Sequence, residues 1–237
     1  MPTDTAVSIS GLTKRYQTTV ALDALNLTLE AGQIVGLMGE NGCGKTTLLK
    51  ILAGVLSDWT GTVTMFGHPI GVDTKAFTSF LPDESFLPDN ITAGDGLRLY
   101  SEFFADFDQT KAHDMLKFFG LDERQALKAM SKGMREKLQI ALAMSRNARV
   151  FLLDEPISGV DPAARETIMS GLIRNFSDDA LMIVSTHLIA DIEHILDTAL
   201  FMRGGRIVLQ GYADDLRAER GMSLDHIFRK EFQWSAN

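Results

Sequence analysis

The chain carries the segment Gly39-Glu40-Asn41-Gly42-Cys43-Gly44-Lys45-Thr46, which fits the phosphate-binding pattern of a glycine, four variable residues, then glycine, lysine and serine or threonine. The pattern is informative only between a strand and a helix, and here an apolar stretch (34–38) precedes it and a helical stretch (46–52) follows it. Glycines let the backbone curl so that its N–H groups surround phosphate oxygens at the positive end of the helix. The segment therefore predicts a nucleotide-binding P-loop.

Within this loop the side chains have separate expected roles. Lys45 is placed to reach the β- and γ-phosphates, and the Thr46 hydroxyl is placed to bind Mg²⁺, which prefers oxygen ligands. The predicted nucleotide-binding residues of the loop are Gly39, Glu40, Asn41, Gly42, Cys43, Gly44, Lys45, Thr46 and Thr47.

The single cysteine of the chain, Cys43, lies in the same loop. A helix N-terminus and the neighbouring Lys45 are expected to favour its thiolate, so thiol reagents should inhibit and bound nucleotide should protect. The alternative is that this position only requires a small side chain.

Bulk composition limits the class of protein. At 237 residues the chain has room for one large α/β domain or two small ones. Its 23 Lys+Arg against 31 Asp+Glu give a net charge of −8, the wrong sign for a chain that mainly neutralises nucleic-acid phosphates. No apolar run approaches the roughly 18 residues of a membrane span, and residues 1–10 lack the features of a signal peptide. We expect a soluble, cytoplasmic chain with no nucleic-acid partner.

Hydrophobic patterning predicts an α/β fold with strands on both sides of the P-loop. Residues 92–130 have helical periodicity, and Asp161 as N-cap with Pro162 as first residue opens a later helix. Apolar runs separated by that helix indicate a doubly wound parallel sheet. Expected strands are 7–9, 20–22, 25–29, 34–38, 62–66, 76–81, 150–153 and 180–185, followed by a hairpin of 200–202 with 206–209.

Two carboxylates end the apolar stretch 151–153. Asp154 is placed to hold Mg²⁺, directly or through water. Glu155, one residue later, is the candidate general base for an attacking water molecule. Helix capping is the alternative for such a pair, but it explains one acid and leaves the apolar strand before them unexplained.

A series of motifs then points to a family. The P-loop, Ser-Lys-Gly-Met-Arg (131–135), Leu-Leu-Asp-Glu-Pro (152–156), Ser-Gly-Val-Asp (158–161) and Ser-Thr-His (185–187) follow in this order. The series resembles the ATP-binding subunit of ABC transporters from end to end. The resemblance implies a P-loop NTPase core with a parallel sheet, an antiparallel β subdomain and an inserted helical subdomain.

The motif at 131–135 predicts a second anion site, because the Ser131 hydroxyl, the amides of Lys132 and Gly133 and the helix dipole lie together. Resemblance implies that this site serves the γ-phosphate held by a partner subunit. In the family the motif usually reads Leu-Ser-Gly-Gly-Gln, so Ser131 and Gly133 match, whereas Met130, Lys132, Met134 and Arg135 depart from it.

Further site residues are implied by their places in the family series. His187 corresponds to a switch histidine that contacts the γ-phosphate and the catalytic acid, and Tyr16 to the aromatic residue that stacks on adenine. Asp161 corresponds to a loop that communicates across a dimer. Asp83 stands where the family has a glutamine near the metal; its carboxylate can offer an oxygen to Mg²⁺ but cannot donate as an amide does. The catalytic residues are then Lys45, Glu155 and His187.

Together these features predict one ABC-type ATPase domain over 1–237, with the helical subdomain at about 92–146. The expected function is MgATP hydrolysis that powers transport through a separate transmembrane permease subunit, with a second ATP-binding subunit and peripheral attachment to the cytoplasmic face of the membrane. Residues 81–84, 131–134 and 223–228 are most similar to the bacterial exporters of drugs, peptides or lantibiotics. The alternative is a soluble ABC ATPase that acts on nucleic acid or ribosomes.

Overall fold

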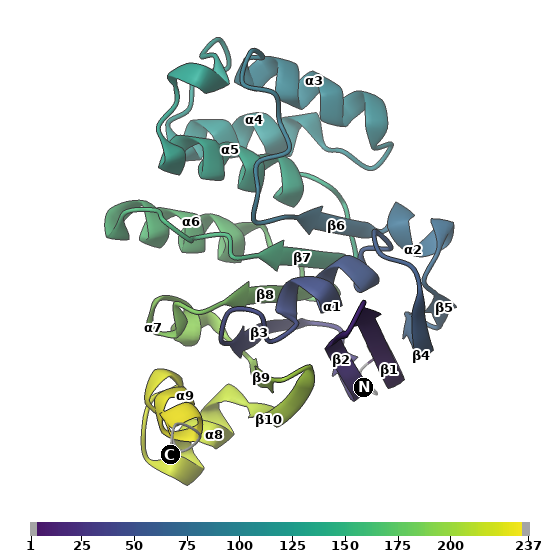
Figure 1. Cartoon of the computed structure of the whole chain (residues 1–237). Coiled ribbons are helices and arrows are strands. Elements are labelled where there is room, and N and C mark those ends of the chain that lie inside the picture. The colour runs from purple at the N-terminus through teal and green to yellow at the C-terminus, as the bar shows by residue number, and fades with distance from the viewer. Residues whose placement is uncertain (1–3, 234–237) are drawn as a thin grey trace.

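The computed structural model of the chain describes residues 4–233. Its larger sheet has the strand order β10-β9-β3-β8-β7-β6, with β6 to β9 and β3 parallel and β10 antiparallel at the edge (Figure 1). The strands are β3 (Gln33–Gly39), β6 (Thr78–Leu81), β7 (Val150–Asp154), β8 (Leu181–Thr186), β9 (Thr198–Arg203) and β10 (Arg206–Tyr212). Because β3, β7 and β8 are adjacent and parallel, the residues that follow them meet at one edge of the sheet.

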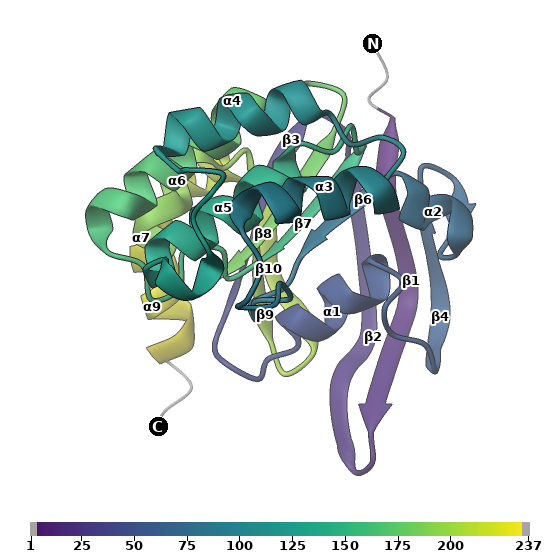
Figure 2. The ribbon, with the colours of Figure 1, turned by 90° about the horizontal axis from the view of Figure 1, so that it is seen from above.

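A second, antiparallel sheet has the order β2-β1-β4-β5. It consists of β1 (Thr5–Tyr16), β2 (Thr19–Glu30), β4 (Trp59–Met65) and β5 (His68–Pro69). Helix α1 (Lys45–Leu52) lies beside β1 and β2, as Figure 2 shows. The predicted antiparallel β layer is therefore present, and α1 lies between it and the parallel sheet.

Helices cover the other face of the parallel sheet. The group α3 (Ala93–Phe103), α4 (Gln109–Phe119) and α5 (Lys132–Met144) lies beyond β6 at the top of Figure 1. The remaining helices are α2 (Val72–Ala76), α6 (Pro162–Asn175), α7 (Ile189–Ile192), α8 (Ala213–Arg220) and α9 (Leu224–Gln233). The α/β class with an antiparallel sheet and an inserted group of helices is thus confirmed.

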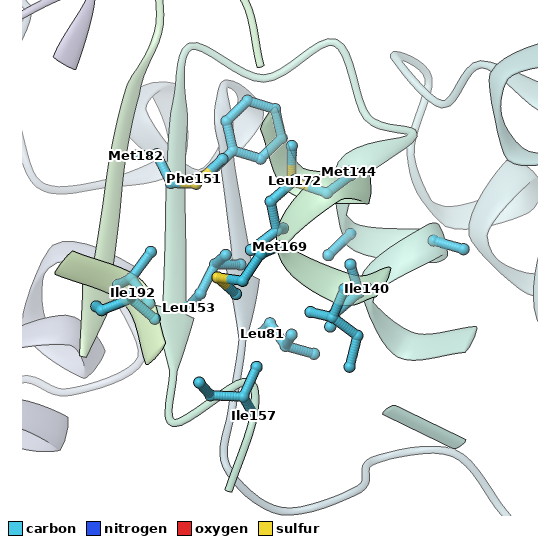
Figure 3. Packing of buried hydrophobic residues seen from close by; sticks show 14 of the residues in the cluster. Leu81, Ile140, Met144, Phe151, Leu153, Ile157, Met169, Leu172, Met182 and Ile192 are labelled. Atoms are coloured by element: carbon cyan, nitrogen blue, oxygen red, sulfur yellow. The ribbon is translucent and has the colours of Figure 1, made fainter. Parts of the chain in front are cut away.

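Alternation along β7 explains why this strand is apolar throughout. Val150 and Leu152 belong to the core shared with α1 and the antiparallel sheet, while Phe151 and Leu153 belong to the core on the helical side. Figure 3 shows Phe151 and Leu153 among side chains of α5 and α6, including Ile140 and Met169. Both faces of β7 are buried from Val150 to Leu153, which favours apolar side chains at all four positions.

Several strand boundaries differ from the sequence-based expectation: β1 extends beyond 7–9 on both sides, the expected strands 20–22 and 25–29 form the single strand β2, and β4 begins at Trp59. The predicted strand 76–81 is shorter, because the preceding residues form α2 and β6 begins only at Thr78. The Thr74 hydroxyl donates to the Gly71 carbonyl and accepts from the Gly71 N–H, which satisfies backbone groups at the start of the helix. The apolar residues of 76–81 do not indicate that the Thr74 side chain caps a short helix just before the strand.

Arg146 joins the helical group to the parallel sheet. It is 4% exposed, and its guanidinium donates to the carbonyls of Thr78 (2.6 Å) and Ala76 (2.8 Å) and to both carboxylate oxygens of Asp106. It also lies 4.1 Å from the ring centroid of Phe104. One side chain thus binds β6, the last residue of α2 and the segment between α3 and α4.

We expect Arg146→Met to lower the free energy of unfolding by about 3 kcal/mol, because it breaks a largely buried ion pair and leaves Asp106 without its cation. Urea unfolding followed by circular dichroism measures this. The matched control is Arg98→Met, which removes an exposed pair with Asp95 and should change the free energy of unfolding far less. Equal effects of the two substitutions would contradict the anchoring role of Arg146.

Candidate nucleotide-binding site

The P-loop connects the end of β3 at Gly39 to the start of α1 at Lys45. Gly42 and Gly44 have φ angles of +80° and +114°, which side-chain-bearing residues rarely adopt. A Cβ on Gly44 would also lie 2.5 Å from the Ala21 carbonyl oxygen. The glycines are therefore required both by backbone conformation and by the close approach of β2.

Lys45 lies along this loop with only 6% of its surface exposed. Its ammonium donates to the carbonyls of Gly39 (2.7 Å) and Glu40 (3.3 Å) and lies 3.7 Å from Glu155 Oε1. These contacts hold the cation at the mouth of the loop. Gly39 and Glu40 therefore contribute to the loop through their backbone carbonyl oxygens, which position the Lys45 ammonium.

An open cavity of about 490 Å³ lies over the P-loop and gathers most of the predicted residues. Three further residues, Thr19, Ala21 and Ser158, were not predicted. Thr19 pairs with Tyr16 across the β1–β2 hairpin, a register that could have indicated it. The lining residues are Tyr16, Thr19, Ala21, Asn41, Gly42, Gly44, Lys45, Thr46, Thr47, Asp83, Glu155, Ser158 and His187.

Asp154 lies at the end of β7, 1% exposed. Its Oδ1 accepts from Ser185 Oγ (2.5 Å), whereas its Oδ2 is buried with no hydrogen-bond partner among residues 4–233. A buried carboxylate oxygen without a partner is costly unless a cation or donor completes it. This oxygen therefore fits the predicted role of a Mg²⁺ ligand.

Glu155 has the left-handed φ of +51°, which turns its side chain out of the line of β7. Its N–H donates to the Ser185 carbonyl (3.0 Å), and its Oε2 lies 2.9 Å from His187 Nδ1. The strained residue is thus fixed between β8 and the segment that follows β8. This geometry brings the predicted base, the predicted switch histidine and Lys45 together.

Asp83 follows β6 and lines the same cavity. Burial, and then the charge of Asp154, raise the pKa of its carboxyl above the ordinary value. The Asp83 carboxyl is therefore influenced by the charge of Asp154, and its role near a bound metal stays a prediction.

The structure contradicts the expected reactivity of Cys43. The residue is 7% exposed and packs in the core cluster beside α1, and burial raises the pKa of its thiol despite the nearby Lys45. Desolvation outweighs the positive charge because the sulfur faces the protein interior. The prediction of a favoured thiolate was wrong.

Three other predicted residues lie away from this cavity. Ser131 caps α5 and its hydroxyl accepts from the Met134 N–H (3.2 Å), with Gly133 in the first turn. Asp161 caps α6 and accepts from the Ala164 N–H (3.0 Å), as predicted from its place before Pro162. Gly133 lies close to Asp161, because a Cβ on Gly133 would be 3.8 Å from the carboxylate. The residues form a second cluster on the same chain.

Comparison with known proteins agrees with this geometry. The family model described as ABC transporter matches residues 22–158, more than half of the chain. The chain belongs to the ABC transporter family. As an ABC transporter ATP-binding domain it binds nucleotide and is an ATPase, and its function is to power transport.

Relatives of this ABC ATPase include the daunorubicin resistance ATP-binding protein DrrA3 of Streptomyces coeruleorubidus, 28% identical, with 98% of this chain and 77% of that protein covered. The ABC transporter ATP-binding protein NatA of Bacillus subtilis is 27% identical, with 94% and 96% covered. A solved ATP-binding subunit of an ABC transporter has a TM-score of 0.83 and 24% identity, with 95% of this chain and 98% of that chain covered. That structure shows the shared fold.

No helix in the part of the chain that the structure describes is long and apolar enough to cross a membrane.

Proposed function

We propose that this ABC ATPase is a single-domain subunit of an exporter, works as an ATP-dependent dimer, and attaches to a separate membrane subunit at the cytoplasmic face of the membrane. The observation that carries the proposal is the division of the site: Lys45, Glu155 and His187 line one cavity, whereas Ser131 and Gly133 lie outside it. An export role is supported by relatives named for daunorubicin resistance and for Nod factor export.

In the bound state the Tyr16 ring stacks on adenine, and the amides of 41–47 surround the phosphates. Thr46 and the unpartnered Asp154 Oδ2 hold Mg²⁺, with Asp83 nearby, and the ion supplies positive charge at the phosphate oxygens. Lys45 adds a further positive charge from within the loop. The side chains of this chain thus supply oxygen ligands for the metal and a cation for the phosphates of MgATP.

Hydrolysis depends on the pair of Glu155 and His187. Glu155 accepts the proton of the attacking water, because it is the carboxylate that lines the cavity next to Lys45. His187 Nδ1, 2.9 Å from Glu155 Oε2, holds this carboxylate in one orientation. Glu155 is thus the general base, and the His187 imidazole is the group that positions it.

The second cluster completes the site of another copy. The N-terminus of α5 offers its first amides and the Ser131 hydroxyl on an exposed surface. A triphosphate held by a second copy fits this anion site, so two nucleotides lie between two chains. The adjacent Asp161 then connects this surface to the α6 segment.

A surface groove of about 410 Å³ beside the P-loop edge is the proposed contact for the membrane subunit. Phe103 is 74% exposed and Phe86, whose ring packs against Tyr100, is still 40% exposed. Exposed aromatic side chains gathered in one groove mark an interaction site. Pro82 lines the groove and is next to Asp83, so the groove adjoins the nucleotide cavity along the chain. We assign to it a short apolar helix face of the membrane subunit, whose docking can affect Asp83 through the neighbouring Pro82. The lining residues are Phe80, Pro82, Phe86, Leu99, Tyr100, Phe103 and Phe104.

We expect Phe103→Asp to reduce co-purification with the proposed membrane subunit by about tenfold or more, because docking would bury an unpaired carboxylate. Affinity purification of the co-expressed, detergent-solubilised pair measures it. The matched control is Val72→Asp, an 85% exposed apolar residue on α2, away from the groove. Undiminished co-purification of the Phe103 variant would overturn the docking assignment, and ATP binding by the isolated variant verifies its folding.

A further inference from the structure

Lys14 is a buried lysine to which the reaction assigns no role. It lies in β1, two residues before Tyr16, and is 7% exposed. Its ammonium donates to the carbonyls of Ser57 (2.7 Å) and Asp58 (3.0 Å). A buried ammonium is costly unless its N–H groups are satisfied, so this position is defined closely by its partners.

The same ammonium lies 5.1 Å from the ring centroid of Tyr16. Two of the three N–H groups of Lys14 are used by carbonyls, which leaves one to face the π system. Tyr16 is 44% exposed and lines the nucleotide cavity, whereas Lys14 does not. The lysine therefore contacts the ring without occupying the space that the nucleotide needs.

The two carbonyls belong to the segment that follows α1. This helix begins in the P-loop at Lys45 and ends at Leu52, and Ser57 and Asp58 lead from it into β4. Lys14 also pairs with Trp59 in the β1–β4 register. The Lys14 side chain thus ties β1, the strand that carries Tyr16, to the segment between α1 and β4. Figure 2 shows the ribbons of β1, β4 and α1.

We propose that Lys14 is a positioning residue for the nucleotide: it fixes the Tyr16 ring for stacking on adenine and is itself held by the carbonyls of the segment between α1 and β4. This inference rests on the proposed role of Tyr16. A cation beside an aromatic ring restricts its orientation and draws on its electron density, which favours stacking against an electron-rich base. The Tyr16 ring is then already ordered before ATP binds, so binding loses less conformational entropy.

The test uses the purified full chain and two probes, ATP and inorganic tripolyphosphate. Lys14→Met keeps the length and apolar stem of the side chain and removes the charge. We expect it to weaken ATP binding and raise KM about 3- to 10-fold, while tripolyphosphate binding and kcat at saturating ATP keep their parent values. Lys14→Arg retains the cation and should restore most of the ATP affinity. Isothermal titration and steady-state kinetics give these quantities.

A double-mutant cycle with Tyr16→Leu separates the inference from the assignment on which it rests. We expect Lys14→Met to cost no additional ATP affinity when Tyr16 is already leucine. If Tyr16→Leu weakens ATP binding but Lys14→Met does not, or if Lys14→Met weakens both probes equally, the role of Lys14 is refuted and that of Tyr16 stands. If Tyr16→Leu leaves ATP binding unchanged, the adenine assignment fails and the inference fails with it, while the catalytic assignment of Glu155 is unaffected.

Discussion

Glu155→Gln is expected to slow ATP hydrolysis by roughly two to four orders of magnitude while ATP still binds, because the amide keeps the shape of the side chain but cannot accept a proton. In the structure Glu155 is the carboxylate of the cavity that contacts both Lys45 and His187. Single-turnover and steady-state phosphate release measure the loss. An amide at this position can still bond to His187, so the site should remain assembled.

The matched control is Glu166→Gln on the exposed surface of α6, which changes the net charge equally and touches none of these groups. We expect the control to turn over ATP at the parent rate. A Glu155 variant that hydrolyses ATP near the parent rate would show that another group takes the proton.

Lys45→Ala should lower the affinity for MgATP by about 10- to 100-fold, the cost of losing charge-assisted hydrogen bonds to phosphate oxygens. The substitution also removes the cation that lies 3.7 Å from Glu155, so turnover of any ATP that binds should fall. Equilibrium binding of a fluorescent ATP analogue, with competition by ATP, gives the affinity. The variant should remain folded, since Lys45 lines the cavity and water can enter the space its side chain leaves beside the Gly39 and Glu40 carbonyls.

The control for this prediction is Lys50→Ala, which removes an equal charge from the last turn of the same helix. Its ATP affinity should match that of the parent chain. Equal affinity of the Lys45 variant and the parent would contradict the phosphate contact of Lys45.

Much of the fold could be predicted from the sequence, because turn glycines, apolar stretches and helix caps occur where the structure needs them. The P-loop has glycines where the backbone needs positive φ, as at Gly42 and Gly44. The apolar stretch ending in Asp154 and Glu155 forms a strand that is buried on both faces, and its end meets the P-loop edge. Asp161 before Pro162 correctly predicts that α6 begins at Pro162.

Other features depend on contacts that no local pattern contains. The thiol pKa of Cys43 is set by burial against the core, which outweighs its neighbour in sequence. Thr19 and Ala21 reach the cavity only because β2 folds back beside the P-loop. Lys14 acquires its carbonyl partners from residues more than 40 positions away. Such tertiary contacts decide how exposed each side chain is and which charges surround it. The motif residues could therefore be predicted from the sequence, whereas the residues that contact them could not.

The α5 N-terminus is the part of the site that a single chain leaves unused. Ser131 is exposed, and among the described residues its hydroxyl makes a hydrogen bond only within its own helix. The hydroxyl is therefore accessible to a ligand bound by another molecule. The departures from the usual family motif, Lys132 among them, leave the Ser131 cap and the first-turn glycine in place. This surface is the basis for the proposed dimer.

The most direct test of the account is the mass of the Glu155→Gln protein in solution with and without saturating MgATP, measured by light scattering after gel filtration. The account predicts a dimer of twice the single-chain mass, containing one ATP per chain, only when MgATP is present. Adding Gly133→Arg should abolish the dimer, because the larger side chain blocks the α5 N-terminus. A Glu155→Gln protein that binds ATP yet remains monomeric would contradict the shared site between two copies.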